Sequence, residues 1–206
     1  MKEGDTVFLT DGKGTLAEAI LLQFAGKRCH ARIMNSRQTP LESGISLHIA
    51  IAPTKSTDRF TWFCEKATEL GIAEITPLIC ARSERSSIKT DRFHKVLIAA
   101  MKQSLKTWLP ILHEPVPFDR FLKNTIPGQK FLAWCGTGEE PGLWRIINAR
   151  EPVTVMIGPE GDFTDAEVGN ATSHGFIPVS LGKSRLRTET SGLLVCCLGR
   201  IMGAGE

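Results

Sequence analysis

One stretch of the chain, VTVMIGPEGDFTDAE from Val153 to Glu167, decides the fold. It begins with five apolar or β-branched residues, which are typical of a buried strand. It ends with Thr164 and Glu167 at the spacing of a capping box, which predicts the start of a helix. A strand that leads through a short loop into a helix is the unit of an α/β fold. The loop from Gly158 to Phe163 should therefore lie at the carboxyl end of a strand, where such folds bind ligands.

Similar units lie on both sides of this stretch. Apolar runs predict strands near residues 47–52, 74–80, 131–135 and 178–181, and periodic apolar faces predict helices over 59–70, 92–105 and 189–202. Asp58 is the expected cap of the first helix and Gly71 its left-handed end, while Leu105 is expected on the apolar face of the second. The alternation predicts a mainly parallel sheet with helices on both faces.

The start of the chain has a different pattern. Short alternating segments at residues 6–9, 16–21 and 29–33 are separated by glycine-containing turns, which predicts a small β module. Residues 38–44 are polar and turn-rich and are interpreted as a linker. We therefore expect a β module over residues 1–38 and an α/β domain over residues 45–206.

Composition excludes some classes of protein. The 206 residues contain no apolar run long enough to span a bilayer, and the start lacks the apolar core of a signal peptide, so we expect a cytoplasmic protein. A net charge of +3 is too weak by itself to establish a nucleic-acid partner. The six cysteines are scattered and are expected to be reduced and mostly buried. The five histidines show no ligand spacing, so no metal site is expected, and the four tryptophans are expected in the core or in interfaces.

The loop from Gly158 to Phe163 holds the first candidate chemistry. Its glycines let a ligand approach the backbone, and Pro159 stiffens the path between them. A phosphate would meet Glu160 and Asp162 without any lysine or arginine, whereas a positive centre such as the sulfonium of S-adenosylmethionine would be attracted. A plain strand-to-helix turn explains these residues equally well.

A second loop, from Leu181 to Thr190, enters the last helix and contains three cations, among them Arg187. A solvated basic surface with Thr188 as helix cap is the commoner meaning of such a pattern, but Arg187 abuts the helix start. Basic residues also gather between Lys55 and Arg92 among serines and threonines. That mixture suits phosphate contacts and fits an ordinary surface equally well.

Taken together, these segments resemble the bacterial ribosomal RNA uridine-N3 methyltransferases, the RsmE family of the SPOUT superfamily. The resemblance covers nearly the whole chain. Its motifs are Lys55, Lys66–Ile72, Ile75–Pro77, Glu84–Ser86, Gln103-Ser104 with Leu109-Pro110, Ile157–Gly161, and Leu181-Gly182 with Leu186–Thr190. Asp162 stands where this family usually has a second glycine. Family members also have one or two further strands before Lys2, a difference that affects RNA binding more than cofactor binding.

The resemblance implies an α/β SPOUT-type methyltransferase domain with a deep C-terminal trefoil knot, and a small N-terminal PUA-like β-barrel module that is possibly truncated here. It implies a homodimer to which the last helix contributes. It implies S-adenosylmethionine as cofactor and methylation of N3 of a uridine in 16S ribosomal RNA of the small subunit. Three alternatives remain open: a SPOUT enzyme acting at another RNA position, a non-catalytic RNA-binding assembly factor, and an α/β enzyme with a phosphate ligand.

The loop chemistry and the resemblance together assign candidate site residues. Arg187 is expected to stabilise negative charge on the uracil, and Glu189 to orient Arg187 or to accept the N3 proton. The expected cofactor-binding residues are Ile157, Gly158, Pro159, Glu160, Gly161, Leu181, Gly182, Leu186, Thr188 and Thr190. The expected RNA-binding residues are Lys55, Lys66, Arg82, Arg85 and Lys102.

Overall fold

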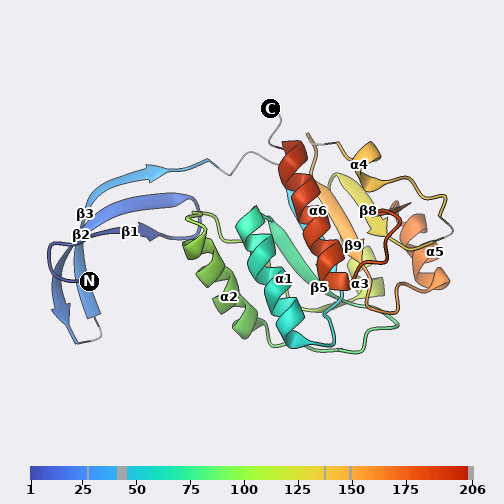
Figure 1. Cartoon of the computed structure of the whole chain (residues 1–206), viewed down its shortest axis with the longest axis horizontal. Helices are drawn as coiled ribbons and strands as arrows, with labels where there is room; N and C mark the ends of the chain where they lie inside the picture. The colour runs from blue at the N-terminus through green and yellow to red at the C-terminus, as the bar shows by residue number, and fades with distance from the viewer. Residues whose placement is uncertain (27, 41–45, 137, 149, 204–206) are drawn as a thin grey trace.

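The computed structural model describes residues 1–26, 28–40, 46–136, 138–148 and 150–203. Within them the chain forms a three-stranded antiparallel sheet and a larger parallel sheet with helices on both faces (Figure 1). The predicted α/β architecture with a parallel sheet is therefore confirmed. The predicted linker over residues 38–44 lies partly outside the described residues, because 41–44 are not among them.

The large sheet has the strand order β10-β8-β9-β4-β5-β6, and β7 also pairs with β5. Its strands are β4 (Leu47–Ile51), β5 (Glu74–Ile79), β6 (Ile111–Leu112), β7 (Val116–Pro117), β8 (Gln129–Ala133), β9 (Val153–Ile157) and β10 (Ile177–Val179). Every pairing in this sheet is parallel. β9 lies between β8 and β4, and all five of its residues are buried. The carboxyl ends of these strands therefore point to one edge of the sheet.

Successive residues of the central strands face opposite layers. Ile49 and Ile51 of β4 belong to one apolar cluster and Ala50 to the other. The first cluster is covered by α1 (Thr57–Leu70), α2 (Thr90–Gln103) and α6 (Thr188–Gly203), and the second by α3 (Phe118–Leu122) and α5 (Asp165–Ser173), as Figure 1 shows. The short helix α4 (Leu143–Ile146) packs through Leu143 on the first cluster. Burial on both faces explains why these strands are continuous apolar runs.

The helices begin and end close to the predicted positions, with two corrections. Ser56 is the N-cap residue of α1, whereas Asp58 lies in its first turn, so the predicted cap at Asp58 is wrong. Gly71 ends α1 with a φ of 85°, as predicted. Leu105 was expected on the apolar face of α2, but it has a φ of 56° and is 90% exposed. A residue in the left-handed region does not continue a right-handed helix, so α2 ends before it.

The β module consists of β1 (Thr6–Thr10), β2 (Thr15–Ala25) and β3 (Arg28–Gln38), with β2 in the centre. It meets the rest of the chain at Trp108, whose indole Nε1 donates to the carbonyls of Thr39 and Pro40, both at 3.2 Å. Gly14 has a φ of 93°, and a Cβ there would lie 2.5 Å from the Trp108 ring. Glycine is thus required where the module touches the tryptophan.

The predictions for cysteine and tryptophan hold in part. Cys64, Cys80 and Cys196 are buried, and burial raises the pKa of each thiol, so these three behave as small apolar residues. Cys29 and Cys135 are exposed, so the cysteines are not mostly buried as expected. Trp108 lies in an interface as expected, whereas Trp62 and Trp144 are more than 40% exposed.

In the described part of the chain, no helix has the length and apolarity needed to cross a membrane.

Gly192 provides a test of how α6 packs against α1. A Cβ at this position would lie 2.5 Å from the Phe63 ring and 3.0 Å from Ile51. We expect Gly192→Ala to lower the free energy of unfolding by about 1–3 kcal/mol, because the core must shift to admit the methyl group. Gly169→Ala is the matched control, since Gly169 lies inside α5 with open space around it and alanine is the better helix former. Urea unfolding measures both variants, and equal stabilities would contradict the close packing.

Candidate functional site

A cavity of about 830 Å³ lies where β8, β9 and β10 end. Most of its wall comes from three segments at the ends of these strands, which are Ala133–Cys135, Ile157–Glu160 with Asp162, and Ser180–Thr188, and Gly138, Glu140 and Ser191 complete it. Since the three strands are parallel neighbours, segments far apart in the sequence meet at one edge of the sheet. A cavity of this size is in the range of small-molecule sites.

Most of the predicted cofactor residues line this cavity. They are Ile157, Gly158, Pro159, Glu160, Leu181, Gly182, Leu186 and Thr188. Gly161 is not among the described lining residues, and a Cβ there would face the Arg82 side chain at 3.3 Å. Thr190 lines a neighbouring cavity instead. The sequence reasoning missed Trp134 and Cys135, which the rule for carboxyl ends of parallel strands would have found, because they directly follow β8.

Hydrogen bonds tie the three walls together. The buried Thr188 donates through Oγ1 to the carbonyl of Gly158 at 3.1 Å, joining the two predicted ligand loops. The Asp162 carboxylate accepts from the backbone N–H of Cys135 at 3.0 Å, and Glu160 accepts from the N–H of Lys55 at 3.1 Å. The acidic side chains of the loop therefore hold neighbouring loops in place while they line the cavity.

The backbone of Asp162 explains its departure from the family pattern. Its φ is 61°, in the left-handed region that glycine adopts without strain. Aspartate tolerates this region better than most residues, because its short carboxylate can bond to local backbone groups. Here Asp162 Oδ1 accepts from the N–H of Phe163 at 2.8 Å. The aspartate thus preserves the turn that a glycine would make.

The predicted capping box starts α5. Thr164 Oγ1 accepts from the N–H of Glu167 at 3.2 Å, and Glu167 accepts from the N–H of Thr164 at 2.9 Å. Glu167 also accepts from the N–H of Ala81 at 2.8 Å, which connects the loop to the end of β5. Arg82 reinforces this contact by donating to the carbonyl of Gly161 at 2.7 Å.

A second cavity, of about 410 Å³, lies beside the first. It is lined by Asp58, Arg59, Trp62, Arg187, Glu189 and Thr190. Arg187 lines both cavities and so stands in the wall between them. The Glu189 carboxylate is 8% exposed and lies 3.7 Å from Nε of Arg59. The second cavity thus combines a half-exposed indole with two guanidinium groups.

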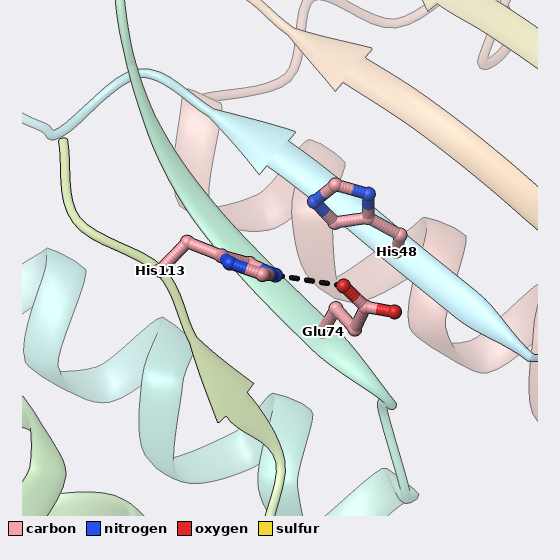
Figure 2. A group of neighbouring side chains, drawn as sticks. All are labelled: His48, Glu74 and His113. Atoms are coloured by element: carbon pink, nitrogen blue, oxygen red, sulfur yellow. Dashed lines mark hydrogen bonds and ion pairs between the residues drawn. The ribbon is translucent and has the colours of Figure 1, made fainter. Parts of the chain in front are cut away.

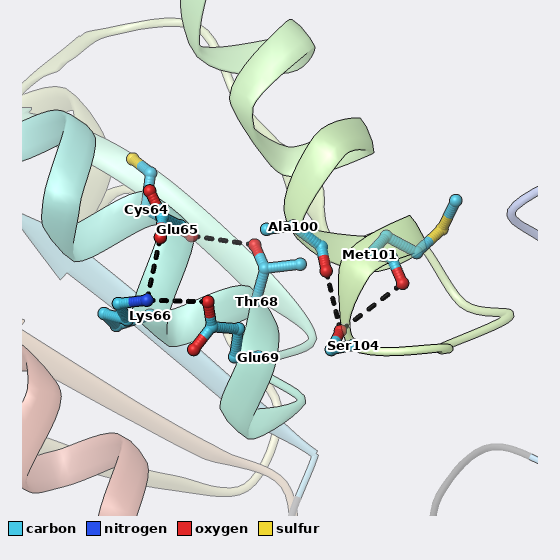
Figure 3. A network of polar contacts seen from close by, with 8 residues as sticks. All are labelled: Cys64, Glu65, Lys66, Thr68, Glu69, Ala100, Met101 and Ser104. Carbon is cyan, nitrogen blue, oxygen red and sulfur yellow. Dashed lines mark hydrogen bonds and ion pairs between the residues drawn. The ribbon is translucent and has the colours of Figure 1, made fainter.

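The cations expected to contact RNA are mostly engaged within the protein. Figure 3 shows Nζ of Lys66 between Glu65 and Glu69, at 2.7 and 2.8 Å. Nζ of Lys55 lies 2.8 Å from Glu84, and Arg85 donates to the carbonyl of Lys55 at 2.9 Å. In the same way, Arg82 is engaged with Gly161 as described above. Lys102 is exposed in the last turn of α2.

The expectation that the histidines form no group is wrong. His48, Glu74 and His113 lie together at the start of β4, the start of β5 and the end of β6. His113 Nε2 lies 2.7 Å from Glu74, and His48 Nε2 lies 2.8 Å from the hydroxyl of Thr76. Burial lowers the pKa of His48 to about 4, and the neighbouring Glu74 opposes this shift.

These features define the class of the protein. It is an α/β protein with a parallel sheet, a cavity of small-molecule size at the carboxyl edge of that sheet, and a second cavity beside it that two arginines and two carboxylates line. Residues 41–199 match the model of the RNA methyltransferase domain, and the chain belongs to that family.

Individual relatives confirm the resemblance to the RsmE family. The chain is 29% identical over 93% of its length to the ribosomal RNA small subunit methyltransferase E of Synechocystis, of which it covers 64%. It superposes on a probable rRNA-methyltransferase from Porphyromonas gingivalis with a TM-score of 0.93 and 35% identity, over 99% of this chain and 87% of that one. It also matches the ribosomal RNA small subunit methyltransferase E of Neisseria gonorrhoeae bound to S-adenosyl methionine. There the TM-score is 0.87 and the identity 27%, over 96% of this chain and 83% of that one.

The state of His48 predicts a pH dependence of stability. In the unfolded chain His48 should bind a proton near pH 6.5, whereas in the folded protein it should do so only near pH 4. Its contribution is therefore complete above about pH 6.5 and is lost as the pH falls toward 4. His48→Gln keeps a polar group for Thr76 but does not titrate. The difference in free energy of unfolding between the native chain and this variant should fall as the pH is lowered from about 6.5 toward 4. A difference that stays constant over this range would refute the lowered pKa of His48.

Proposed function

We propose that this protein is an S-adenosylmethionine-dependent methyltransferase that methylates N3 of a uridine in 16S ribosomal RNA of the small subunit. The observation that carries the proposal is the position of Arg187 in the wall shared by the two cavities. One cavity suits the cofactor and the other suits the target base. A cation between them faces the place where negative charge develops on the base during transfer.

The larger cavity fits S-adenosylmethionine by the chemistry of its walls. Gly158 and Gly182 line the cavity without a side chain that would fill it, and the side chains of Leu181 and Leu186 supply apolar surface for an adenine. The wall contains the carboxylates of Glu140, Glu160 and Asp162 as well as the cations Lys183, Arg185 and Arg187, so a sulfonium can lie beside the carboxylates and a carboxylate of the ligand beside the cations. When bound, this cofactor supplies a methyl group on a positively charged sulfur.

The smaller cavity supplies what the uracil needs. Trp62 offers a face on which a base can stack, and the guanidinium of Arg187 can hydrogen-bond to the carbonyl oxygens next to N3. In the net reaction the N3–H bond and the sulfur–methyl bond break and an N3–CH₃ bond forms. The proton must leave N3, because only the deprotonated nitrogen has an electron pair to accept the methyl group. A uridine reaches this cavity only when it is unpaired or flipped out of its stack.

We propose that the Glu189 carboxylate accepts the proton that leaves N3 of the uracil. The wall of the smaller cavity contains two carboxylates, Asp58 and Glu189, and Glu189 is the one shielded from solvent. Its ion pair with Arg59 fixes where the carboxylate lies. The same pair places a second cation beside Arg187, so Glu189 is also a positioning residue for this wall.

We propose that the five cations expected to bind RNA have different roles. Lys102 offers exposed positive charge for phosphates, and the half-buried Arg85 offers the part of its guanidinium that does not bond to Lys55. Arg82 and Lys55 act mainly by holding the cofactor loop, since the Arg82 guanidinium donates to the carbonyl of Gly161 and the backbone N–H of Lys55 donates to Glu160. The charge of Lys66 is offset by its two glutamates, so it contributes least to RNA affinity.

We propose that the chain has two domains, over residues 1–38 and 45–206. The first would be a PUA-like RNA-binding module, since every described residue of β3 is exposed and available to a partner. The second would have the trefoil knot of SPOUT enzymes, formed by the loops that Thr188 and Gly158 join. We further propose a homodimer through α6, where Ile201 is 70% exposed. As a ribosomal RNA enzyme it would act in the cytoplasm.

Calorimetric titration of the full chain tests the cofactor assignment. We expect S-adenosylmethionine to bind more tightly than ATP, because a triphosphate would bring several negative charges beside Glu160 and Asp162, whereas the carboxylates and cations of the wall can each find a partner on S-adenosylmethionine. Gly182→Ala should weaken binding about tenfold, since the φ of Gly182 is 117° and a side chain there strains the loop. Gly169→Ala serves as the control with native affinity. Binding of ATP alone would overturn the proposal in favour of a phosphate-ligand enzyme.

Methylation of small subunits that lack the modification tests Arg187. We expect Arg187→Ala to lower kcat by about 10²–10³ while changing cofactor affinity far less, because the cation acts on charge that develops during transfer. Mass spectrometry of the RNA identifies the methylated base. Arg145→Ala, an exposed arginine of α4 outside both cavities, should retain native turnover. Full turnover by Arg187→Ala would remove Arg187 from the mechanism, and a base other than 3-methyluridine would refute the proposed product.

A further inference from the structure

His48, Glu74 and His113 form a cluster that has no role in the reaction proposed above. His48 and Glu74 come from neighbouring parallel strands, and His113 comes from the segment next to β6, as Figure 2 shows. His48 of β4 is the register partner of Glu74 of β5. His113 directly follows β6, and its N–H donates to the carbonyl of Ile75 at 2.9 Å. The pairing of the sheet therefore fixes the three side chains on one face.

The chemistry of this cluster is that of a metal site. The two imidazoles and the carboxylate each offer one ligand atom, and these atoms lie within 4.8 Å of one another. Two imidazole nitrogens with one carboxylate oxygen are a ligand set that zinc takes, with an open position left for water. We propose that His48, Glu74 and His113 bind a divalent transition-metal cation, with Zn²⁺ as the best match.

The surroundings support a built site over a chance meeting. The His48 ring packs edge-on against Phe121 at 5.7 Å between centroids, which limits its rotation. Thr76 places its hydroxyl 2.8 Å from His48 Nε2, where it can hold the ring in the absence of metal or turn to hydrogen-bond a metal-bound water. His113 and Glu74 are 41% and 36% exposed, so an ion can enter from solvent.

The cluster lies apart from both cavities. His48 and Glu74 stand at the amino ends of their strands, whereas the cofactor cavity lies beyond the carboxyl ends of β8, β9 and β10. None of the three residues lines either cavity. A shared ion would join β6, which has only two residues, to β5 and β4. It would stabilise the folded chain, since the unfolded chain does not bring the three ligands together.

Titration of the chelator-treated full chain with ZnCl₂ tests the site. We expect one ion per chain, a rise in Tm on adding Zn²⁺, and visible absorption bands of a low-symmetry site when Co²⁺ replaces zinc. His113→Ala and Glu74→Gln should each weaken Zn²⁺ binding by about tenfold or more. His30→Ala removes an exposed histidine of β3 and should bind as the native chain does.

Binding of S-adenosylmethionine by the same variants separates this inference from the proposed function. The variants should keep native cofactor affinity and native circular dichroism, which shows that they are folded. The proposed site would be overturned if His113→Ala and Glu74→Gln both bound zinc as tightly as the native chain does. It would also be overturned if the native chain did not bind zinc. Loss of affinity in His30→Ala as large as in His113→Ala would also overturn it, because the ion would then be an adventitious surface ion only.

Discussion

The parallel pairing of β9 with β4 on one side and β8 on the other is the constraint on which the molecule depends. β9 is buried along its whole length, so its backbone groups must pair within the sheet and its side chains must pack on both layers. This arrangement fixes the register of the central strands. It also sends the segments after β8 and β9 to the same edge, where the larger cavity forms.

The walls of that cavity are held in place by hydrogen bonds between loops rather than by helices or strands. Thr188 binds the carbonyl of Gly158, Asp162 binds the N–H of Cys135, and Glu160 binds the N–H of Lys55. Each bond joins segments at least 27 residues apart in the sequence. A site built in this way is organised before a ligand arrives, which lowers the conformational cost of binding. The acidic loop thus has a structural role as well as an electrostatic one.

The folded chain does not present the single basic patch that the sequence suggests. Lysine and arginine are dense between Lys55 and Arg92, which in the sequence looks like one basic patch. In the folded chain Lys66 is balanced by two glutamates, and Arg82 is turned inward to a backbone carbonyl. Arg187, by contrast, stands between two cavities. The partners of a cation decide its function, and only the fold supplies those partners.

The sequence by itself determined the central strands, the long helices and the two loops that line the larger cavity. The apolar run of β9, the capping box of Thr164 and Glu167, and the left-handed Gly71 depend on neighbours a few residues away, so local patterns suffice to predict them. Only the tertiary structure decided that Gly161 lies against Arg82, that Leu105 leaves its helix for solvent, and that His48 meets Glu74 and His113. These outcomes depend on the register of parallel strands and on packing between distant segments, which no local periodicity records.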